Sequence, residues 1–421
     1  MRTQVAIIGA GPAGMFLAHL LHSLDVAVTV FERRDRAYVE GRVRAGVLEQ
    51  GTMDVLADLG LDGRMRVEGL KHAGTNIASD GEMFRIDFAA LTGGSQVMVY
   101  GQQEVMHDLF NAAVSRNIQV IFGAEEIALH DISRGEPFVT WRHAGQQHRI
   151  DCDFIAGCDG FHGISRDSIP NLAKRIFEKV YPFGWLGILA DVPPAHDELI
   201  YASHHRGFAL ASMRSKARSR YYIQCSLDEK IEDWPDERFW DEVTLRLGRS
   251  AHVTRGPSFE KSIAPLRSFV CQPMQYGKLF LLGDAAHIVP PTGAKGMNLA
   301  VADAVLLSDL LVQFFRDRSY LGLARYSDQA LERVWRAQQF SWWFTGLTHR
   351  FPQNDAFARQ MQGAELNYLR DSKALQTAFA ENYVGCPRRK KRVPPPIPVG
   401  TPCVAGKIEI AGTKSFQRQE K

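Results

Sequence analysis

The chain has little cysteine, and its cysteines are not spaced for metal binding or crosslinking. Its 421 residues include six cysteines, and none of them forms a Cys-x-x-Cys pair. Secreted disulfide frameworks are much denser, and structural zinc sites use closely spaced ligand pairs. We therefore expect reduced thiols, no metal site and a cytoplasmic location.

Long apolar runs are also missing, and the net charge is low. No stretch is typical of a membrane span, and the first apolar segment reads as a strand rather than as a secretory signal. Residues 387–421 hold nine Lys or Arg against two Glu, which is enough to account for the net charge of +3.

This basic, proline-rich tail is expected to be disordered because it cannot bury a core. It could contact nucleic acid or anionic surfaces, or be a solvated appendage or an artificial extension. We favour the last two and expect neither nucleic acid nor a membrane as a partner.

A dinucleotide-binding pattern stands near the start of the chain. An apolar run over 5–8 leads into Gly9-x-Gly11-x-x-Gly14, a helical segment follows, and a second apolar run ends at Glu32. Gly9 permits a tight turn, Gly11 allows a pyrophosphate to approach the backbone, and Gly14 lets helix and strand pack closely. Glu32 can accept from ribose hydroxyls. An ordinary glycine-rich turn is the weaker alternative, because the flanking apolar strand, the helical segment and the acidic residue all match the dinucleotide-binding pattern.

Arginines cluster after this strand, at positions 33, 34, 36, 42 and 44. They are either a solvated helix start or groups that capture phosphate, since the guanidinium fork matches phosphate oxygens. The pyrophosphate of the first nucleotide and the 2′-phosphate of a second one are both candidates. Asp35, inside the cluster, weakens the second possibility.

Two other strand ends carry an acid beside a glycine. One apolar strand ends at Asp159-Gly160, and a later one runs into Gly283-Asp284, followed by a Pro/Gly loop over 290–298 and a helix from about Asn298. Backbone N–H groups of such a loop can hold phosphate or an electron-rich ring. Asp284 can accept from a ribityl or ribose hydroxyl.

The spacing of apolar residues predicts different secondary structure in other parts of the chain. Residues 71–100 are predicted to form short strands and 101–116 a helix. From about 181 to 264 the apolar period approaches two, which predicts a second, mostly β domain. Residues 326–384 are predicted to be aromatic-rich helices used for packing or as a subunit interface.

The nucleotide pattern and the two acid-glycine turns together resemble the class A flavoprotein aromatic hydroxylases. Segments 42–51, 158–166, 262–267 and 289–296 are similar to the 4-hydroxybenzoate 3-monooxygenase family, and the resemblance covers about residues 1–386. It implies one FAD per chain and the reaction of 4-hydroxybenzoate, NADPH and O2 to 3,4-dihydroxybenzoate through a flavin C4a-hydroperoxide. It also implies a homodimer.

The resemblance implies an α/β (α+β) fold with a Rossmann-type FAD-binding domain and a second, mostly β substrate domain. We assign residues 1–180 and 269–345 to the first domain and 181–268 to the second. Residues 346–386 are assigned to C-terminal helices that are expected to form a dimer contact, and 387–421 are the tail.

Site roles are carried over from the family by position. The substrate carboxylate is assigned to Ser212, Arg214 and Tyr222. The substrate hydroxyl is assigned to Tyr201, to Tyr383 and His72 as a relay toward solvent, and to the carbonyl of Pro291. Taken alone, Arg214 could be an exposed strand arginine and His72 a packing residue. A tyrosine, with its pKa near 10, suits a relay, and a histidine suits the outlet.

The cofactor contacts are also carried over from the family by position. The FAD contacts are expected to be Gly9, Gly11, Gly14, Glu32, Arg42, Arg44, Val47, Gln102, Asp159, Arg220, Asp284, Gly293, Lys295, Gly296, Met297 and Asn298. Only one dinucleotide fingerprint stands out, so the pyridine nucleotide would have no Rossmann domain of its own. Its candidate contacts are Arg33, Tyr38, Arg42, Arg44, His162 and Arg267. NADPH is favoured, and NADH is possible.

Three alternatives stay open. The chain could hydroxylate a related benzoate, although residues matching both ends of a para-hydroxy acid argue against this. A flavin halogenase would need a Gly-Trp-x-Trp-x-Ile-Pro stretch, which residues 184–189 do not match. A non-catalytic FAD-binding protein would bind flavin without substrate-stimulated NADPH oxidation.

Overall fold

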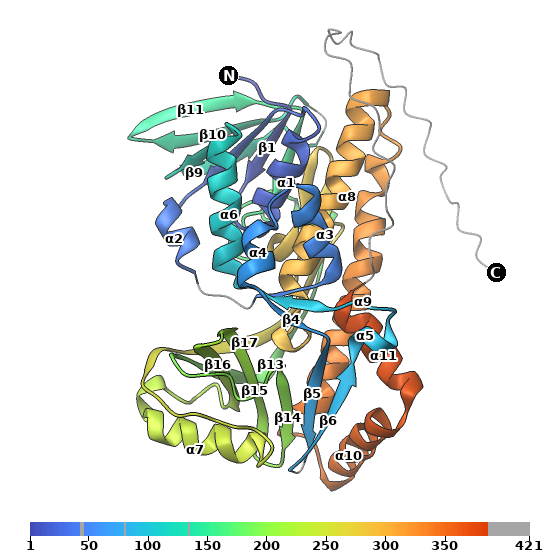
Figure 1. Cartoon of the computed structure of the whole chain (residues 1–421). Coiled ribbons are helices and arrows are strands. Elements are labelled where there is room, and N and C mark those ends of the chain that lie inside the picture. The colour runs from blue at the N-terminus through green and yellow to red at the C-terminus, as the bar shows by residue number, and fades with distance from the viewer. Residues whose placement is uncertain (43–45, 80, 134, 386–421) are drawn as a thin grey trace, which may run out of the picture. The chain divides into compact units, whose positions relative to one another are not determined.

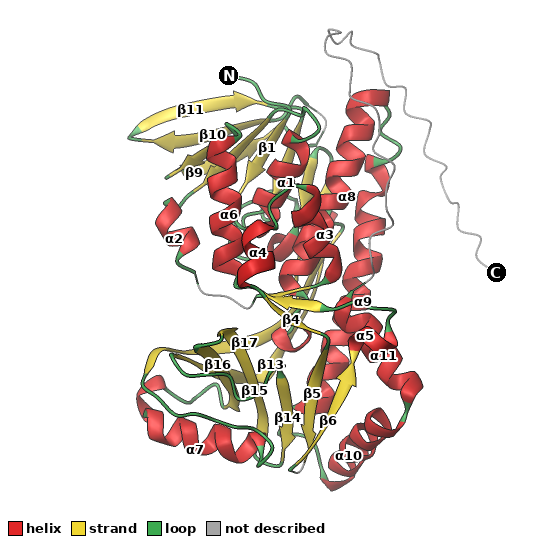
Figure 2. Ribbon diagram, in the orientation of Figure 1, coloured by secondary structure: helices red, strands yellow, loops and turns green. Residues whose placement is uncertain are grey.

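The computed structural model describes residues 1–42, 46–79, 81–133 and 135–385, and the basic tail lies outside this range (Figure 1). The described residues belong to one compact unit. It contains a mainly parallel sheet with flanking helices, a large mixed and mostly antiparallel sheet, and helices at the C-terminal end (Figure 2). The predicted α/β (α+β) class with these three parts is confirmed.

The parallel sheet carries the nucleotide pattern. Its strand order is β18-β19-β12-β1-β2-β8, and β1 pairs in parallel with both β2 and β12. All four residues of β1 are buried, because helices cover it. The strands are β1 Val5–Ile8, β2 Val28–Glu32, β8 Gln119–Phe122, β12 Phe154–Gly157, β18 Gln275–Tyr276 and β19 Leu279–Leu281. A separate three-stranded sheet is formed by β9 Glu125–His130, β10 Phe138–His143 and β11 Gln146–Asp151.

Helices from distant parts of the chain pack on this sheet. Helix α1 lies against both α6 and α8. The expectation that no stretch is typical of a membrane span is wrong by length and hydropathy for helix α8, but 67% of its apolar window is buried inside the protein, as in a core helix. The helices here are α1 Pro12–His22, α2 Arg36–Glu40, α3 Gln50–Asp58, α4 Gly63–Glu68, α6 Gln102–Ser115 and α8 Gly296–Asp317.

The large sheet has the order β20-β17-β13-β16-β15-β14-β5-β6. Its last two strands come from residues 74–87, so the sheet draws on chain outside the 181–268 interval. Helix α7 packs on β14 and β15. The elements are β5 Gly74–Ser79, β6 Glu82–Asp87, β13 Arg175–Ala190, β14 Ile200–His204, β15 Gly207–Ser215, β16 Arg218–Cys225, α7 Asp236–Leu247, β17 Ser258–Gln272 and β20 His287–Ile288.

A three-stranded sheet and the last helices complete the unit (Figure 1). Helix α9 is long and contacts strands β14 and β17 of the large sheet. It also contacts the loop before α8, which belongs to the nucleotide-binding part of the chain. The remaining elements are β3 Val47–Leu48, β4 Leu70–His72, β7 Val97–Val99, α5 Phe88–Leu91, α9 Tyr326–Thr348, α10 Ala356–Asp371 and α11 Lys373–Val384.

Candidate active site

The turn between β1 and α1 is shaped by its glycines. Gly9 has φ +101°, and a Cβ on it would lie 2.4 Å from the Cys158 carbonyl oxygen. A Cβ on Gly14 would lie 2.0 Å from the Gly9 oxygen, whereas one on Gly11 would meet nothing within 4 Å. Packing therefore requires Gly9 and Gly14. Gly11 borders open space at the first turn of a helix, where a pyrophosphate fits.

A cavity of about 450 Å³ lies beside this turn. Glu32 closes one side, since its carboxylate accepts hydrogen bonds of 2.9 Å from the backbone N–H groups of Ala10 and Arg34. Residues of the predicted site that line the cavity are Gly9, Glu32, Arg33, Asp159 and His162.

Asp159 has one satisfied and one unsatisfied oxygen. Its Oδ2 accepts from the backbone N–H and the hydroxyl of Ser165, both at 2.9 Å. Its Oδ1 is buried and has no partner among the described residues, and burial raises the pKa of this carboxyl. Buried acceptors are normally satisfied, so this oxygen fits a ligand hydroxyl. With Gly11 and the cavity, it matches the adenosine half of a dinucleotide such as FAD.

The Gly283-Asp284 turn is tied to helix α8. Gly283 has φ +58°, and its N–H donates to Asp303 Oδ2 at 3.1 Å. The same oxygen lies 2.6 Å from His287 Nε2, with both side chains buried. Sequence reasoning missed this pair, although His287 belongs to the quoted Gly-Asp segment. Asp284 itself is exposed, which suits a hydroxyl-bearing ligand.

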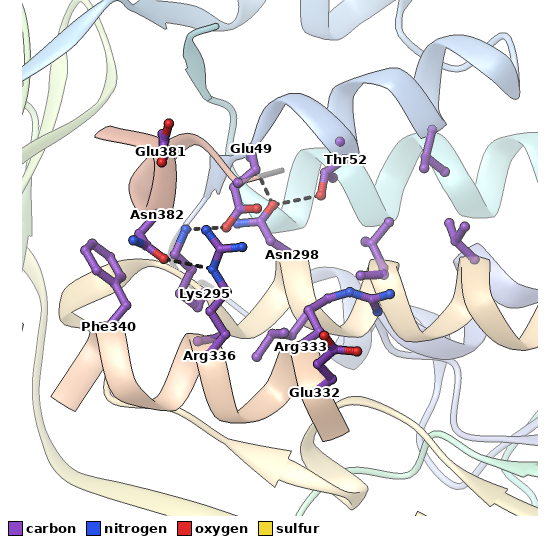
Figure 3. A pocket seen from close by; sticks show the side chains of 18 of the residues that line it. Glu49, Thr52, Lys295, Asn298, Glu332, Arg333, Arg336, Phe340, Glu381 and Asn382 are labelled. Atoms are coloured by element: carbon purple, nitrogen blue, oxygen red, sulfur yellow. Dashed lines mark hydrogen bonds and ion pairs between the residues drawn. The ribbon is translucent and has the colours of Figure 1, made fainter. Parts of the chain in front are cut away.

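The loop before α8 is anchored by its own side chains (Figure 3). Lys295 Nζ lies 2.6 Å from Glu49 Oε1 and donates to the Tyr383 carbonyl oxygen at 2.9 Å. Asn298 donates to Val47 O at 2.9 Å and accepts from the Thr52 hydroxyl at 2.7 Å. Lys295 and Asn298 are thus occupied within the protein. Any flavin contact here falls to the backbone N–H groups of the first turn of α8, which lack intrahelical acceptors.

The predicted loop residues occupy the start of that turn. Gly296 and Met297 are the first two residues of α8, and Gly293 ends a short 3-10 turn that begins at Pro291. A second cavity, of about 430 Å³, lies between α3, α8, α9 and α11. It is lined by Lys295 and Asn298 but by none of the side chains predicted to bind substrate. Glu49, which sequence reasoning passed over, lies within the segment 42–51 that carries the family resemblance.

At one end of the large sheet, two buried phenols meet. Tyr201 on β14 and Tyr383 on α11 are each 1% exposed, and their hydroxyl oxygens are 2.7 Å apart. Burial raises the pKa of both. Both hydroxyls therefore stay protonated at neutral pH and can relay a proton rather than abstract it as anions.

His72 is buried but separate from this pair. It ends β4 with 1% exposure, and neither ring nitrogen has a hydrogen-bond partner among the described residues. Burial lowers its pKa to about 4, although Glu198 acts in the opposite direction. The structure therefore joins two members of the predicted relay and leaves the third unconnected to them.

Arg214 lies on the neighbouring strand β15. Its Nε is buried without a partner, and no ion pair joins it to a carboxylate in the described part of the chain. Burial lowers the pKa of Arg214, and the Tyr222 hydroxyl interacts with it. A desolvated guanidinium without a counterion is costly, so its environment fits an anionic ligand.

Ser212 and Arg220 flank this group but have protein partners. The Ser212 hydroxyl donates to the Arg220 carbonyl oxygen at 3.1 Å, across the pair of strands β15 and β16. Arg220 Nη1 lies 3.1 Å from Glu260 Oε1, and its guanidinium lies 5.1 Å from the centroid of the Tyr222 ring. Ser212 and Arg214 thus lie on β15 and Tyr222 on the adjacent strand β16, and their joint contact with a carboxylate stays a prediction. Arg220 is neutralised by Glu260.

The candidate NADPH residues lie in two places. Arg33 and His162 line the same cavity, while Tyr38 is on α2 and 48% exposed. Arg267 lies 3.1 Å from Glu178 and over the ring of Phe161, next to His162 in the chain. Arg42 lies near Tyr38, with its guanidinium 5.9 Å from that ring. Arg44 lies outside the described residues, and Gln102 is the first residue of α6.

Comparisons with known proteins identify the family and the fold. A family model described as an FAD binding domain matches residues 2–341. The chain is 51% identical over 389 residues to a p-hydroxybenzoate hydroxylase of Acinetobacter baylyi, covering 92% of this chain and 96% of that protein. It is 24% identical to a kynurenine 3-monooxygenase of Drosophila willistoni, covering 78% and 75%. The crystal structure of a p-nitrophenol 4-monooxygenase from Pseudomonas putida superposes with a TM-score of 0.77 at 17% identity, covering 92% and 99% of the two chains.

Proposed function

The chain belongs to the p-hydroxybenzoate hydroxylase family of FAD-binding monooxygenases, and on that premise we propose that it hydroxylates 4-hydroxybenzoate to 3,4-dihydroxybenzoate in aromatic catabolism. The observation that carries the proposal is a site with two unlike ends on one sheet. Arg214 on β15 has no carboxylate partner among the described residues, and the hydroxyl pair is formed by Tyr201 on β14 and Tyr383 on α11. A para-hydroxy acid is complementary to both.

The acid end binds and orients the ring. Arg214 offers a planar fork to the carboxylate, and Tyr222 adds a hydroxyl donor. Ser212 is proposed to join them by turning its hydroxyl from the Arg220 carbonyl oxygen, to which it donates at 3.1 Å, toward the carboxylate. Because the Arg214 Nε is buried and has no hydrogen-bond partner among the described residues, an incoming carboxylate would meet a largely desolvated group. Such charge-assisted contacts are roughly twice as strong as neutral ones.

The phenol end prepares the ring for attack on oxygen. Tyr201 accepts the proton of the substrate hydroxyl while its own proton moves to Tyr383, across the 2.7 Å contact. The ring carbon beside the hydroxyl then carries more electron density. The Pro291 carbonyl is proposed as a further acceptor for the substrate hydroxyl. Bound FAD supplies the electron transfer from the pyridine nucleotide and the activation of O2.

His72 is proposed as the outlet of the relay. The relay needs His72 to reach Tyr383 by a water or by a small movement, since neither of its nitrogens is bonded to a described residue. Several ionisable groups act on its imidazole electrostatically, namely Glu198, His196 and Asp197. His72 would therefore pass the proton toward these residues.

NADPH is proposed as the reductant. Support comes from Arg33 and His162, which line one cavity with the adenosine-facing residues, and from Arg267 beside Phe161. The one dinucleotide fingerprint that stands out in the sequence is assigned to FAD, so the pyridine nucleotide would have no Rossmann domain of its own. Its nicotinamide would therefore meet the flavin at the protein surface. NADH would serve less well because arginines favour a 2′-phosphate.

A homodimer in the cytoplasm is proposed as the working form. Trp342 is 53% exposed on α9, and helix α10 exposes Phe357, Met361 and Tyr368 by 52–73%. Exposed apolar side chains at helical spacing are typical of a covered surface. Light scattering should give twice the mass of one chain, and the double variant W342E/M361E should give one chain with FAD retained.

The test of the reaction is an NADPH oxidation assay with product analysis. Addition of 4-hydroxybenzoate should stimulate NADPH oxidation several-fold and yield 3,4-dihydroxybenzoate in near-stoichiometric amount. Stimulation by another hydroxybenzoate alone would identify a related hydroxylase. A yellow protein without any stimulation would indicate a non-catalytic flavin-binding protein.

A further inference from the structure

A buried imidazole lies behind the acid end of the site and has no role in the reaction as proposed. His349 follows the last residue of α9 and is 0% exposed. Its ring lies nearly parallel to those of Phe208 and Phe183, with centroids 4.1 and 5.0 Å away. Its Nε2 is 2.7 Å from Nε1 of Trp185.

These contacts fix the tautomer of His349. An indole N–H only donates, so Nε2 must be the unprotonated nitrogen that accepts from Trp185. Nδ1 then carries the proton and donates to the Thr345 carbonyl oxygen at 3.1 Å. Burial lowers the pKa of His349 to about 3, so the ring stays neutral and this arrangement persists at any working pH.

The indole held in this way forms one wall around the Tyr222 ring. Trp185 lies 5.1 Å from Tyr222, centroid to centroid. On the facing strand, a Cβ at Gly187 would come within 2.7 Å of the Tyr222 ring, so the phenol lies directly over that glycine. The Arg220 guanidinium lies 5.1 Å from the same ring.

The Tyr222 hydroxyl in turn interacts with Arg214. Contacts therefore run from His349 through Trp185 and Tyr222 to the guanidinium that faces the substrate carboxylate. Displacement of the indole would open space beside Tyr222. Because protein interiors are closely packed, the Tyr222 ring would then move into that space.

We propose that His349 is a positioning residue for the substrate carboxylate: it accepts from Trp185, and the fixed indole keeps Tyr222 aligned with Arg214. His349 is not among the residues assigned above to the substrate or to the cofactor. The inference rests on the proposed function, since it concerns how that site recognises an acid. It assigns His349 and Trp185 to carboxylate selectivity rather than to the reaction itself.

The chain offers matched variants for the test. H349F keeps an aromatic ring but removes the acceptor, and H349Q restores an amide oxygen near the position of Nε2. W185F removes the donor. W240F is the control, because Trp240 is equally buried on the opposite face of the sheet and donates to the Gly256 carbonyl oxygen at 2.9 Å.

The measurement is the Kd of the FAD-loaded protein for 4-hydroxybenzoate and for the neutral 4-hydroxybenzamide, followed by the change in flavin absorbance. H349F should weaken the acid about tenfold, because a displaced indole lets Tyr222 move out of line with Arg214, and the amide less than twofold. H349Q should recover most of the acid affinity, and W240F should match the parent protein. FAD affinity should not change.

A double-mutant cycle separates positioning from general loosening. If His349 acts through Trp185, the H349F/W185F protein should bind the acid no more weakly than the weaker single variant. The inference would be overturned if the Kd of the double variant showed the product of the two single effects. It would also be overturned if H349F weakened both ligands equally or bound the acid as tightly as the parent protein. If H349F does not fold, the comparison of W185F with W240F decides, and equal selectivity in these two overturns it. Failure of the parent protein to bind 4-hydroxybenzoate would overturn the proposed function first.

Discussion

The parallel sheet and the large antiparallel sheet present functional groups in different ways. At the parallel sheet, the groups that face the nucleotide are turn backbone and residues at strand ends, and Gly9 to Glu32 lie within one short segment. At the antiparallel sheet, they are side chains from separate strands and helices, and Tyr201 and Tyr383 are 182 residues apart. The first site depends on local backbone geometry, and the second depends on tertiary packing.

The largest effect is expected at the parallel sheet. Substitution G14V should abolish folding, because a Cβ there would lie 2.0 Å from a backbone oxygen. G11V should fold normally but lose FAD, because its side chain would enter the open space meant for the pyrophosphate. Circular dichroism during heating and flavin absorbance measure the two effects. A folded G14V, or an FAD-loaded G11V, would contradict this account of the turn.

At the antiparallel sheet, the acid end should respond most. R214A should weaken 4-hydroxybenzoate binding by about 2–5 kcal/mol while FAD stays bound, because the carboxylate would be left without its cation. The matched control is R218A, whose arginine pairs with Asp191 at the surface at 2.6 Å. Equilibrium titration of both variants with 4-hydroxybenzoate measures the difference in Kd. Equal Kd values for R214A and R218A would show that Arg214 does not bind the carboxylate.

The phenol end should affect chemistry more than binding. Y201F should lower 3,4-dihydroxybenzoate formation about 100-fold, since general acid–base contributions of that size are typical. NADPH should still be consumed, with hydrogen peroxide released instead of product. Y181F is the control, because Tyr181 is equally buried but contacts Ser268 instead. Full coupling in Y201F would exclude the relay.

A smaller effect concerns acid stability. Burial lowers the pKa of His72 to about 4 from 6.5, so the unfolded chain binds its proton first as pH falls. The free energy of unfolding should therefore fall between pH 6.5 and pH 4, by about 1 kcal/mol in the first pH unit. H72N should remove this share of the slope in denaturant titrations and change little above pH 7, while buried His19 and His349, whose pKa values are lowered to about 4 and about 3, keep their own shares. An unchanged slope would indicate a charged or exposed imidazole.

Removal of residues 386–421 should have no effect on turnover or on substrate Kd. These residues lie outside the described part of the chain, and every group invoked at the two sites precedes them. Steady-state assays of the shortened protein test this. Loss of activity would show that the tail contributes to the site.

The same contrast explains what the sequence could predict. The helix expected over 101–116 is α6, Gln102–Ser115, because its apolar period is local. The recruitment of β5 and β6 into the large sheet could not be predicted, since strand partners far apart in sequence leave no local pattern.

The site divides in the same manner. Gly9, Gly14 and Glu32 follow from a motif with a physical reason for each residue. Tyr201 and Tyr383 follow only from family resemblance, because no spacing rule joins residues that distant. The side-chain partners of Lys295 and Asn298 could not be predicted either, because these side chains bond to Glu49, Val47 and Thr52, which lie about 250 residues earlier in the chain. Their expected contact with FAD through the backbone stays a prediction.

A crystal structure of the FAD-loaded protein with 4-hydroxybenzoate would test the central claim directly. The account predicts the carboxylate oxygens within hydrogen-bond distance of the Arg214 guanidinium and the phenol oxygen within hydrogen-bond distance of the Tyr201 hydroxyl. A ring bound in the reverse orientation, or in the cavity between α3, α8, α9 and α11, would contradict it.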